Sequence, residues 1–565
     1  MDTQRLILFI VFSFSLLLLW QEWEKQHEPA QLATAPATQT SSQGTLPVPS
    51  SNLSTPERAP AHPSQEVTTV QPGQVIKVTT DYLEAELNTA GGDLRHLALL
   101  KHQITEDGKK DNLVLFDDKP PHFYVMQSGL IGDGLPNHKS MFSSEAKEYS
   151  LATGHNSLSV TLTWKGDNGI TVDKIFTFHR GSYLVDTTFK IHNGSDKAIS
   201  PNAYFQLVRD STPPSGEARF VHTYTGPAVY TDAGKFQKVS FSDIEKGKEN
   251  FEKTANNGWV SMLQHYFLTA ILPPEKLPRE FYMKELGNGL FAAGLIVPLK
   301  TVAPGAETSL DVPAYAGPQE QEALKKLAPG LDLTVDYGLL TVIATPLFWF
   351  LSLIHKFVGN WGVAIILLTV LVKGAFYPLS AKSYKSMAQM RLLSPKLKRL
   401  KEMYGDDRQK LHTAMMELYK TEKINPLGGC LPVVVQIPVF ISLYWVLLYS
   451  VELRQAPFIG WIHDLSAPDT LFGVIPIMGG VPIGLLPILM GISMILQTRL
   501  NPTPPDPIQA KVMMVMPVAF SVFFLFFPAG LVLYWLVNNI ISIVQQTLIN
   551  RSIEHAKVAK GSSKR

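Results

Sequence analysis

Residues 361–379 have the sequence WGVAIILLTVLVKGAFYPL, which is 19 residues long and carries one charged side chain, Lys373. A helix needs about 20 consecutive, mostly apolar residues to cross the hydrocarbon core of a bilayer. This stretch therefore predicts a transmembrane helix. The composition agrees, because charged residues make up 17% of the chain, below the roughly 25% of soluble domains.

Similar stretches occur on both sides. Four of them follow residue 379, are uncharged and predict further spans, at residues 427–449, 481–496, 512–527 and 529–549. At the amino terminus, residues 6–20 are uncharged, but no small-residue cleavage site follows them directly. Residues 1–25 are interpreted as an uncleaved signal-anchor helix, with a cleaved signal peptide as the alternative. Six spans predict a multi-pass α-helical membrane protein.

Residues 67–331 have a different pattern, in which apolar and polar residues alternate. Leu158, Val160 and Leu162 alternate with Ser and Thr, and Asp167-Asn168-Gly169 follows this run. Asn-Gly between alternating runs is a strong signal for a β-hairpin. We expect one large antiparallel β-sandwich. It lacks HExxH, GxSxG and Walker motifs, which favours a non-catalytic binding or spacing domain.

Two segments connect the β domain to its neighbours in the chain. Residues 26–66 are rich in Pro, Ala, Ser, Thr and Gln, which predicts a flexible tether. Residues 339–354 are apolar, but we expect Pro346 to break the stretch and His355-Lys356 to end it. Residues 332–360 are therefore interpreted as an interfacial amphipathic helix lying on the membrane.

The distribution of basic residues predicts the orientation. Residues 380–425 carry 11 Lys and Arg, and the tail at 550–565 carries five, whereas residues 450–480 carry one, Arg454. Basic loops stay in the cytoplasm. We therefore expect a cytoplasmic hairpin at 380–426, a cytoplasmic loop at 497–511 and a cytoplasmic tail. Both termini would be cytoplasmic, residues 450–480 and the β domain periplasmic, and the chain an inner-membrane protein of a bacterium.

Charge and cysteine content exclude several other classes. The chain has 50 Lys and Arg against 48 Asp and Glu, so it does not bind DNA through bulk charge. Its single cysteine, Cys430, excludes intramolecular disulfides and cysteine-rich zinc sites. We expect no metal and no cofactor.

Polar side chains within the spans are the candidate site. Burying Lys373 in a membrane costs about 2.5–3.5 kcal/mol, and Thr369 lies one helical turn before it. Further polar or aromatic side chains lie in two other spans, at Gln436, Trp535, Asn538, Asn539 and Ser542. Such residues often hold helices together, but several on separate helices favour a shared hydrophilic recess. Alternatively, Lys373 snorkels to the cytoplasmic end of its span, six residues or about 9 Å away.

The cytoplasmic segment predicts a basic helical hairpin. Met387, Met390 and Met415 belong to two runs of apolar residues at helical spacing, separated by Gly405 and by Asp406-Asp407, which can cap the second helix. Methionine suits promiscuous apolar contacts. An ordinary amphipathic hairpin packed on itself is the alternative.

Five motifs carry a family resemblance. They are Asn425-Pro-Leu-Gly-Gly-Cys-Leu-Pro432, Gln436-Ile-Pro438, Val451-Glu-Leu-Arg-Gln-Ala-Pro457, Trp461-Ile-His-Asp-Leu465 and Phe527-Pro-Ala-Gly-Leu-Val-Leu-Tyr534. The chain resembles the YidC/Oxa/Alb family of membrane-protein insertases over its whole length. The resemblance implies six transmembrane helices, five of them forming a core bundle, and no enzymatic activity.

The resemblance also implies a mechanism. Nascent membrane proteins, alone or with the Sec translocon, would enter a hydrophilic groove open to cytoplasm and lipid. The ribosome would contact the basic hairpin and tail. The groove residues would be Lys373, Thr369, Gln436, Tyr534, Trp535 and Asn538. The chain departs from the family pattern in having Lys373 where most relatives have arginine and Tyr534-Trp535 where two tyrosines are common. Residues 474–484 are extra length without an assigned role.

Two other functions fit parts of the sequence. A solute transporter or channel would also use an intramembrane lysine, but the spans show no inverted repeat and no paired counter-charge. A membrane-tethered periplasmic enzyme would need catalytic residues in the β domain, where no motif indicates any.

Overall fold

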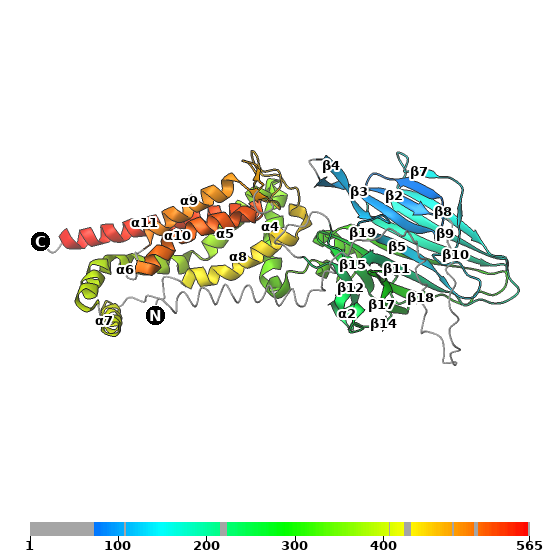
Figure 1. The fold of residues 1–565 in the computed structure, drawn as a ribbon, viewed down its shortest axis with the longest axis horizontal. Helices are drawn as coiled ribbons and strands as arrows, with labels where there is room; N and C mark the ends of the chain where they lie inside the picture. Colours follow the sequence, from blue (N-terminus) through cyan, green and yellow to red (C-terminus); the bar gives the residue numbers. More distant parts are fainter. Residues whose placement is uncertain are drawn as a thin grey trace. The chain divides into compact units, whose positions relative to one another are not determined.

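The computed structural model describes residues 73–106, 109–214, 223–405, 407–422, 431–476, 480–501 and 507–562. The predicted anchor at 1–25 and the tether at 26–66 lie outside the described residues. The described residues fall into two compact units, divided between Thr334 and Val335 (Figure 1). We call residues 73–334 the β unit and residues 335–562 the helical unit.

The β unit contains two large sheets. The first has the order β14 (Thr254–Ala255), β17 (Arg279–Gly287), β18 (Leu290–Pro298), β11 (Asn202–Asp210), β5 (Tyr124–Ile131), β3 (Asp93–Glu106), β2 (Leu83–Asn88), β1 (Val75–Thr79), β7 (Glu148–Ser150), and β4 (Lys109–Phe116) also pairs with β3. The second has the order β13 (Lys235–Lys238), β12 (Gly226–Thr231), β15 (Trp259–Gln264), β16 (Phe267–Ile271), β19 (Glu307–Pro318), β10 (Leu184–Asn193), β9 (Ile170–His179), β8 (Ser157–Lys165), β6 (Ser143–Ser144). Two short helices accompany them, α2 (Phe241–Glu245) and α3 (Gln321–Leu327).

The predicted pair of antiparallel sheets is confirmed, with one exception, because β1 and β7 pair in parallel. Alternate residues of β9 are buried along its whole length, as a strand with one face on a core requires. The predicted turn at Asp167-Asn168-Gly169 joins β8 to β9, and Gly169 has φ +81°. Both sheets contribute to one hydrophobic core, in which the rings of Phe189 and Phe205 lie 5.8 Å apart.

An ion pair lies inside this core. Lys174 of β9 and Asp93 of β3 are both fully buried, with 4.0 Å between Lys174 Nζ and Asp93 Oδ1. The ammonium also donates hydrogen bonds to the backbone carbonyls of Ser128 at 2.8 Å and Gly91 at 3.2 Å. Burial raises the pKa of Asp93 to about 6, against the opposing effect of Lys174. Burial likewise lowers the pKa of Lys174 to about 8.

The helical unit is built from eight helices in its described part. They are α4 (Thr341–Val358), α5 (Trp361–Ala375), α6 (Tyr377–Tyr404), α7 (Arg408–Thr421), α8 (Leu431–Tyr449), α9 (Leu485–Leu500), α10 (Pro507–Phe523) and α11 (Ala529–Ser562). A short 3₁₀ turn, η5 (Phe524–Phe526), follows α10, and a two-stranded hairpin, β20 (Val474–Ile475) and β21 (Val481–Pro482), precedes α9. Helices α4, α5, α8, α9 and α11 share a second hydrophobic core.

Length and composition identify candidate spans among the described helices. Two could each cross a membrane, Thr341–Val358 and Ala529–Ile553, and the bent pair Trp361–Ala375 with Tyr377–Leu393 would make a third. Three apolar helices are shorter, Val435–Tyr449, Leu485–Leu500 and Ala510–Phe526. The interfacial placement of residues 332–360 and the count of six spans stay predictions.

Proline positions account for two differences from the predicted helices. The expected break at Pro346 is wrong, because α4 runs through it to Val358. Pro346 is close to the helix start, so it removes one hydrogen bond near an end that already has unpaired groups. The stretch 361–379 is not one helix, because it bends by 68° between Ala375 and Tyr377. Pro378 lies at the start of α6, and the residue before a proline disfavours helical geometry.

The last two corrections concern helix ends. The predicted span at 481–496 begins too early, because Val481 and Pro482 form β21 and the helix begins at Leu485. The last helix continues from the predicted span into the basic tail and ends at Ser562. Apolar composition does not locate these two ends. Residues 481–484 are as apolar as the helix that follows them, and a basic tail can continue a helix without being apolar.

Candidate functional site

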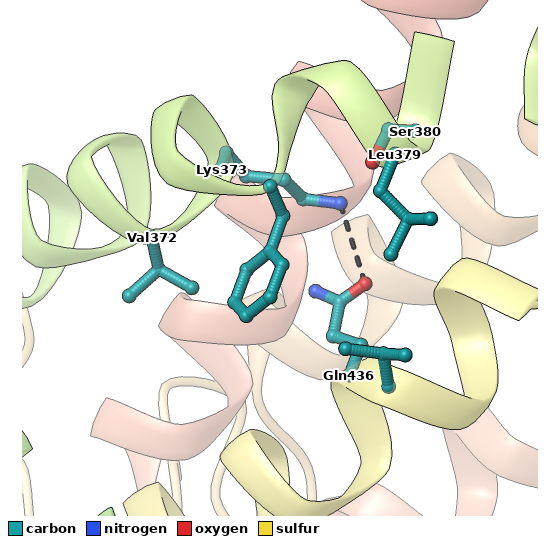
Figure 2. A pocket seen from close by; sticks show the side chains of 7 residues that line it. Val372, Lys373, Leu379, Ser380 and Gln436 are labelled. Carbon is teal, nitrogen blue, oxygen red and sulfur yellow. Dashed lines mark hydrogen bonds between the residues drawn. The ribbon is translucent and has the colours of Figure 1, made fainter. Parts of the chain in front are cut away.

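Three helices bring the candidate polar residues together. Lys373 lies in the last turn of α5 and is 6% exposed. Its side chain points toward Gln436 of α8 across a small recess, as Figure 2 shows. The empty volume of the recess is about 270 Å³, a figure that includes space open to solvent. Its lining consists of Val372, Lys373, Phe376, Leu379, Ser380, Val435 and Gln436.

Neutral oxygen atoms surround the Lys373 ammonium. Its Nζ donates to Ser542 Oγ of α11 at 2.8 Å and to Gln436 Oε1 at 3.4 Å. Within the described residues, no carboxylate lies close enough to Lys373 to form an ion pair. The carbonyl groups at the end of α5 carry partial negative charge, which favours a cation there by roughly 0.3–1 kcal/mol. The positive charge is therefore hydrogen-bonded but not neutralised.

A hydrogen-bond network fixes the groups around this lysine. Gln436 Nε2 donates to Asn538 Oδ1, so the amide oxygen of Gln436 is turned toward Lys373. Ser542 Oγ donates to the Asn538 carbonyl at 2.8 Å, which leaves its lone pairs for the ammonium. Lys373, Gln436 and Asn538 thus form one cluster, as the hypothesis of a shared recess requires.

Thr369 does not belong to this network. It is fully buried, and its hydroxyl donates to the Ile365 carbonyl of its own helix at 2.7 Å. Thr369 therefore lies one turn from Lys373, as helical spacing predicts, but its polar atom is satisfied locally.

Tyr534 and Trp535 form part of an aromatic cluster. The Trp535 ring lies 4.5 Å from that of Phe440 on α8, and the Tyr534 ring lies 6.2 Å from it. Trp535 Nε1 is buried and has no hydrogen-bond partner among the described residues. Such a donor is costly to leave unpaired, so Trp535 offers a hydrogen bond to a polar group that approaches it.

The polar residues along α11 have two different roles. Asn539 Nδ2 donates to Ser493 Oγ of α9 at 3.1 Å, and Gln546 Nε2 donates to the Leu500 carbonyl at 3.2 Å. These two residues hold helices together. Ser542 instead contacts Lys373. The sequence placed Ser542 among the polar residues of a shared recess, four residues from Asn538 and on the same helix face, but did not include it in the groove residues.

The lysine lies nearer to a helix end than the sequence indicated. Helix α5 ends two residues after Lys373, rather than the six expected. The side chain does not extend along its own helix toward the helix end. It lies between α8 and α11, where it donates hydrogen bonds to Gln436 and Ser542. Ser380, at the far side of the bend, also lines the recess and was not predicted.

The predicted hairpin is formed by α6 and α7. Helix α6 ends at Tyr404 before Gly405, and the Asp407 side chain caps α7 by accepting from the Lys410 backbone N–H. Met387, Met390 and Met415 are each partly exposed. Met403 and Met416 expose more of their surface, so the hairpin does not enclose all of its methionines.

The described residues contain no group of three or more His, Cys, Asp or Glu side chains arranged to hold a metal ion. The Lys373 cluster consists of an ammonium, two amides and a hydroxyl. These groups bind anions and polar backbone by charge and hydrogen bonding.

Comparisons with known proteins agree with this organisation. Residues 75–350 match the family model described as YidC periplasmic domain, and residues 353–557 match 60Kd inner membrane protein. The chain is 54% identical to Membrane protein insertase YidC of Methylobacillus flagellatus, over 100% of both chains. It is 53% identical to Membrane protein insertase YidC of Nitrosospira multiformis, over 98% of both.

A solved structure is also similar, a crystal structure of an active YidC insertase with its first transmembrane domain resolved. It is 20% identical, with a TM-score of 0.40 over 84% of this chain and 94% of the other. Identity above one half across the full length is decisive for the family. The chain belongs to the YidC family of membrane protein insertases.

Proposed function

We propose that this protein inserts nascent proteins into the bacterial inner membrane, and that the recess around Lys373 receives their polar segments. The observation that carries the proposal is a buried ammonium bonded to two neutral side chains beside an open recess. A charge in this state has the most to gain from an acidic ligand. Two opposite charges 4 Å apart attract by about 4 kcal/mol at an effective dielectric of 20.

The groove residues have distinct proposed roles. Lys373 attracts acidic side chains, while Gln436 and Asn538 bond to peptide groups that lose their water. This lowers the cost of moving polar backbone through hydrocarbon. Trp535, which is partly exposed, forms the aromatic wall along which an apolar segment slides into lipid, and Tyr534, which is 2% exposed, packs in the aromatic cluster that supports it. Thr369, whose hydroxyl is already bonded, contributes shape rather than a hydrogen bond.

The other parts of the chain support this step. Exposed methionine and basic side chains on α6 and α7 suit early contact with the nascent chain and the ribosome. The basic tail would add to ribosome binding, and the Sec translocon would share some substrates. We place both termini in the cytoplasm and the β unit in the periplasm, following the positive-inside rule. We keep the order of anchor, tether, β domain, spans and cytoplasmic segments that the sequence predicts, and we use the helix limits that the structure gives.

Insertion into proteoliposomes tests the role of Lys373. The full chain and its Lys373→Arg, Lys373→Ala and Lys373→Glu variants are reconstituted at equal amounts, with a small single-span substrate that has an acidic translocated tail. Arginine should retain insertion, alanine should lower it about tenfold, since 1.4 kcal/mol is a factor of ten, and glutamate should abolish it. Lys356→Ala removes an exposed lysine of α4, outside the recess and the hairpin, and is the matched control.

A snorkelling lysine predicts the opposite result. Removing a charge from a span relieves a cost, so Lys373→Ala would then insert the acidic substrate as well as the parent does. Solute flux without insertion would instead favour a transporter.

A further inference from the structure

The segment between α8 and α9 contains a hairpin that the groove mechanism does not use. Strands β20 and β21 pair through Val474 with Pro482 and Ile475 with Val481. Below them, Phe472 N–H donates to the Ile483 carbonyl and Ile483 N–H donates to the Gly473 carbonyl, both at 2.9 Å. This is the extra length in the sequence for which no role was evident.

A buried carboxylate fixes the base of this hairpin. Asp469 is 5% exposed, and its Oδ1 accepts from the Leu471 backbone N–H and from Trp461 Nε1, both at 3.1 Å. Its Oδ2 accepts from the Leu486 backbone N–H, in the first turn of α9, at 2.8 Å. A Cβ added at Gly484 would lie 2.5 Å from the Asp469 side chain. The hairpin is thus held in a set direction relative to α9.

The described part of the hairpin exposes large apolar side chains. Phe472 is 60% exposed, Val474 56%, Ile475 44% and Leu471 41%. The sequence contains no charged residue from Thr470 to Thr498. A surface that docks a protein normally has a polar rim around its apolar centre, which this segment does not provide. A lipid surface requires no such rim.

The two helices next to the hairpin, α9 and α10, also support its contact with lipid. Helix α9 has 16 residues, about 24 Å at 1.5 Å per residue, less than the roughly 30 Å of a hydrocarbon core. Its side chains Ile488 and Ile492 are 40% and 50% exposed. Strand β21 lies against η5. The turn η5 follows α10 directly, and the last two residues of α10, Val522 and Phe523, are each 55% exposed. The hairpin therefore extends an apolar surface shared with two helices.

We propose that this hairpin lies in the interfacial zone of the bilayer, in the leaflet at the N-terminal end of α9. Phe472, Val474 and Ile475 contact the acyl chains next to the headgroups, so the hairpin continues the apolar surface of the short helix α9 toward the headgroup layer. A two-stranded sheet has open edges, whose N–H and C=O groups are not tolerated in hydrocarbon. The hydrated headgroup layer satisfies them, which sets the depth. This proposal requires a membrane-embedded helical unit but no activity of the groove.

Depth-dependent fluorescence quenching tests it. The single cysteine is removed by Cys430→Ser, and Ile475→Cys of the full chain carries an environment-sensitive fluorophore in phospholipid vesicles. Vesicle lipids with a spin label near the headgroup should quench the probe severalfold more than lipids labelled deep in the acyl chain, and aqueous iodide should quench it weakly. The exposed polar position Lys197 of the β unit, as Lys197→Cys, is the control and should respond to iodide.

Two results would overturn the proposal. Strong quenching by iodide without quenching by lipid would place the hairpin in water, and protection from both quenchers would place it against protein. Phe472→Cys provides a second probe position should Ile475→Cys fold poorly. Because the assay reads position rather than insertion, an inactive groove would not change its outcome.

Discussion

Among the described residues, two lysine side chains are buried, one in each unit, and their surroundings differ. Lys174 of the β unit is fully buried beside Asp93 and is bonded to two backbone carbonyls. Three phenyl rings lie within 6 Å of its Nζ, those of Phe142, Phe176 and Phe189. Lys373 of the helical unit has an amide oxygen and a hydroxyl as hydrogen-bond acceptors, and it lines a recess.

The difference indicates how a buried charge is used. The charge of Lys174 is balanced inside the core, where no ligand reaches it, so its effect is on stability. The charge of Lys373 has no acidic partner among the described residues and lies beside a recess, so we propose that its effect is on binding. Burial alone therefore does not distinguish the two lysines, and we propose that the absence of an acidic partner beside a recess marks the functional one.

The largest expected effect is on the stability of the β unit. Lys174→Met leaves Asp93 buried without its partner, and breaking a buried ion pair in this way costs about 3–5 kcal/mol. Hydrogen exchange of the full chain should show this loss in the opening free energy of β9, while substrate insertion is unchanged. Lys190→Met, at an exposed position of β10, is the control. Equal protection of β9 in both variants would mean that the pair is not structural.

The Asp93–Lys174 pair predicts that the free energy of unfolding of the β unit changes with pH by a few kcal/mol. The pKa of Asp93 rises from 3.8 to about 6 on folding, so the folded state holds a proton that the unfolded state loses, and stability falls as pH rises through this window. The pKa of Lys174 falls from 10.5 to about 8, so stability rises with pH between these values. The pair thus contributes least near neutral pH.

Comparison with Asp93→Asn isolates the acidic part of this dependence. The stability of the parent relative to the variant should fall between about pH 4 and pH 6, measured by exchange protection in the β unit. A difference between the two proteins that stays constant with pH would contradict the linkage.

Lys373→Met should show the reverse combination of effects. Insertion of an acidic-tailed substrate should fall about tenfold, since 1.4 kcal/mol is a factor of ten, because the attracting charge is lost. The exchange protection of α5 should stay equal or increase, because an unbalanced charge has left a membrane-embedded helix. Loss of protection together with loss of insertion would make Lys373 a structural residue like Lys174.

The smallest expected effect is that of Ser542→Ala. This change removes one acceptor of the Lys373 ammonium, worth about 0.5–1.5 kcal/mol for an ordinary hydrogen bond, so insertion should fall a fewfold. The loss should be confined to acidic-tailed substrates, since Ser542 positions the charge and does not form the aromatic wall. Ser542→Thr, which keeps the hydroxyl, should restore insertion. Equal losses for neutral-tailed substrates would show a packing role instead.

Features with a local signal were predictable from the sequence. Alternation and Asn168-Gly169 indicated strands β8 and β9, and Gly405 with Asp407 indicated the ends of α6 and α7. The grouping of Lys373, Gln436 and Asn538 followed from several polar residues on separate apolar helices. In each case neighbouring residues, or helical spacing, carry the physical cause.

Features that depend on distant contacts were not predictable. Asp93 and Lys174 are 81 positions apart, so no local pattern pairs them. Ser542 lies on the same helix face as Asn538, but its bond to Lys373 requires the packing of α11 on α5. The hairpin before α9 has the composition of a span, and its strand pairing depends on Asp469, a residue outside the apolar stretch.

Charge reversal tests the central claim most directly. Lys373→Glu and the parent protein are compared in proteoliposomes with two substrates that differ only in a translocated tail of acidic or basic residues. If the charge of Lys373 draws polar segments into the recess, the parent inserts the acidic tail better, and Lys373→Glu prefers the basic one. The same order of preference in both proteins would contradict the account.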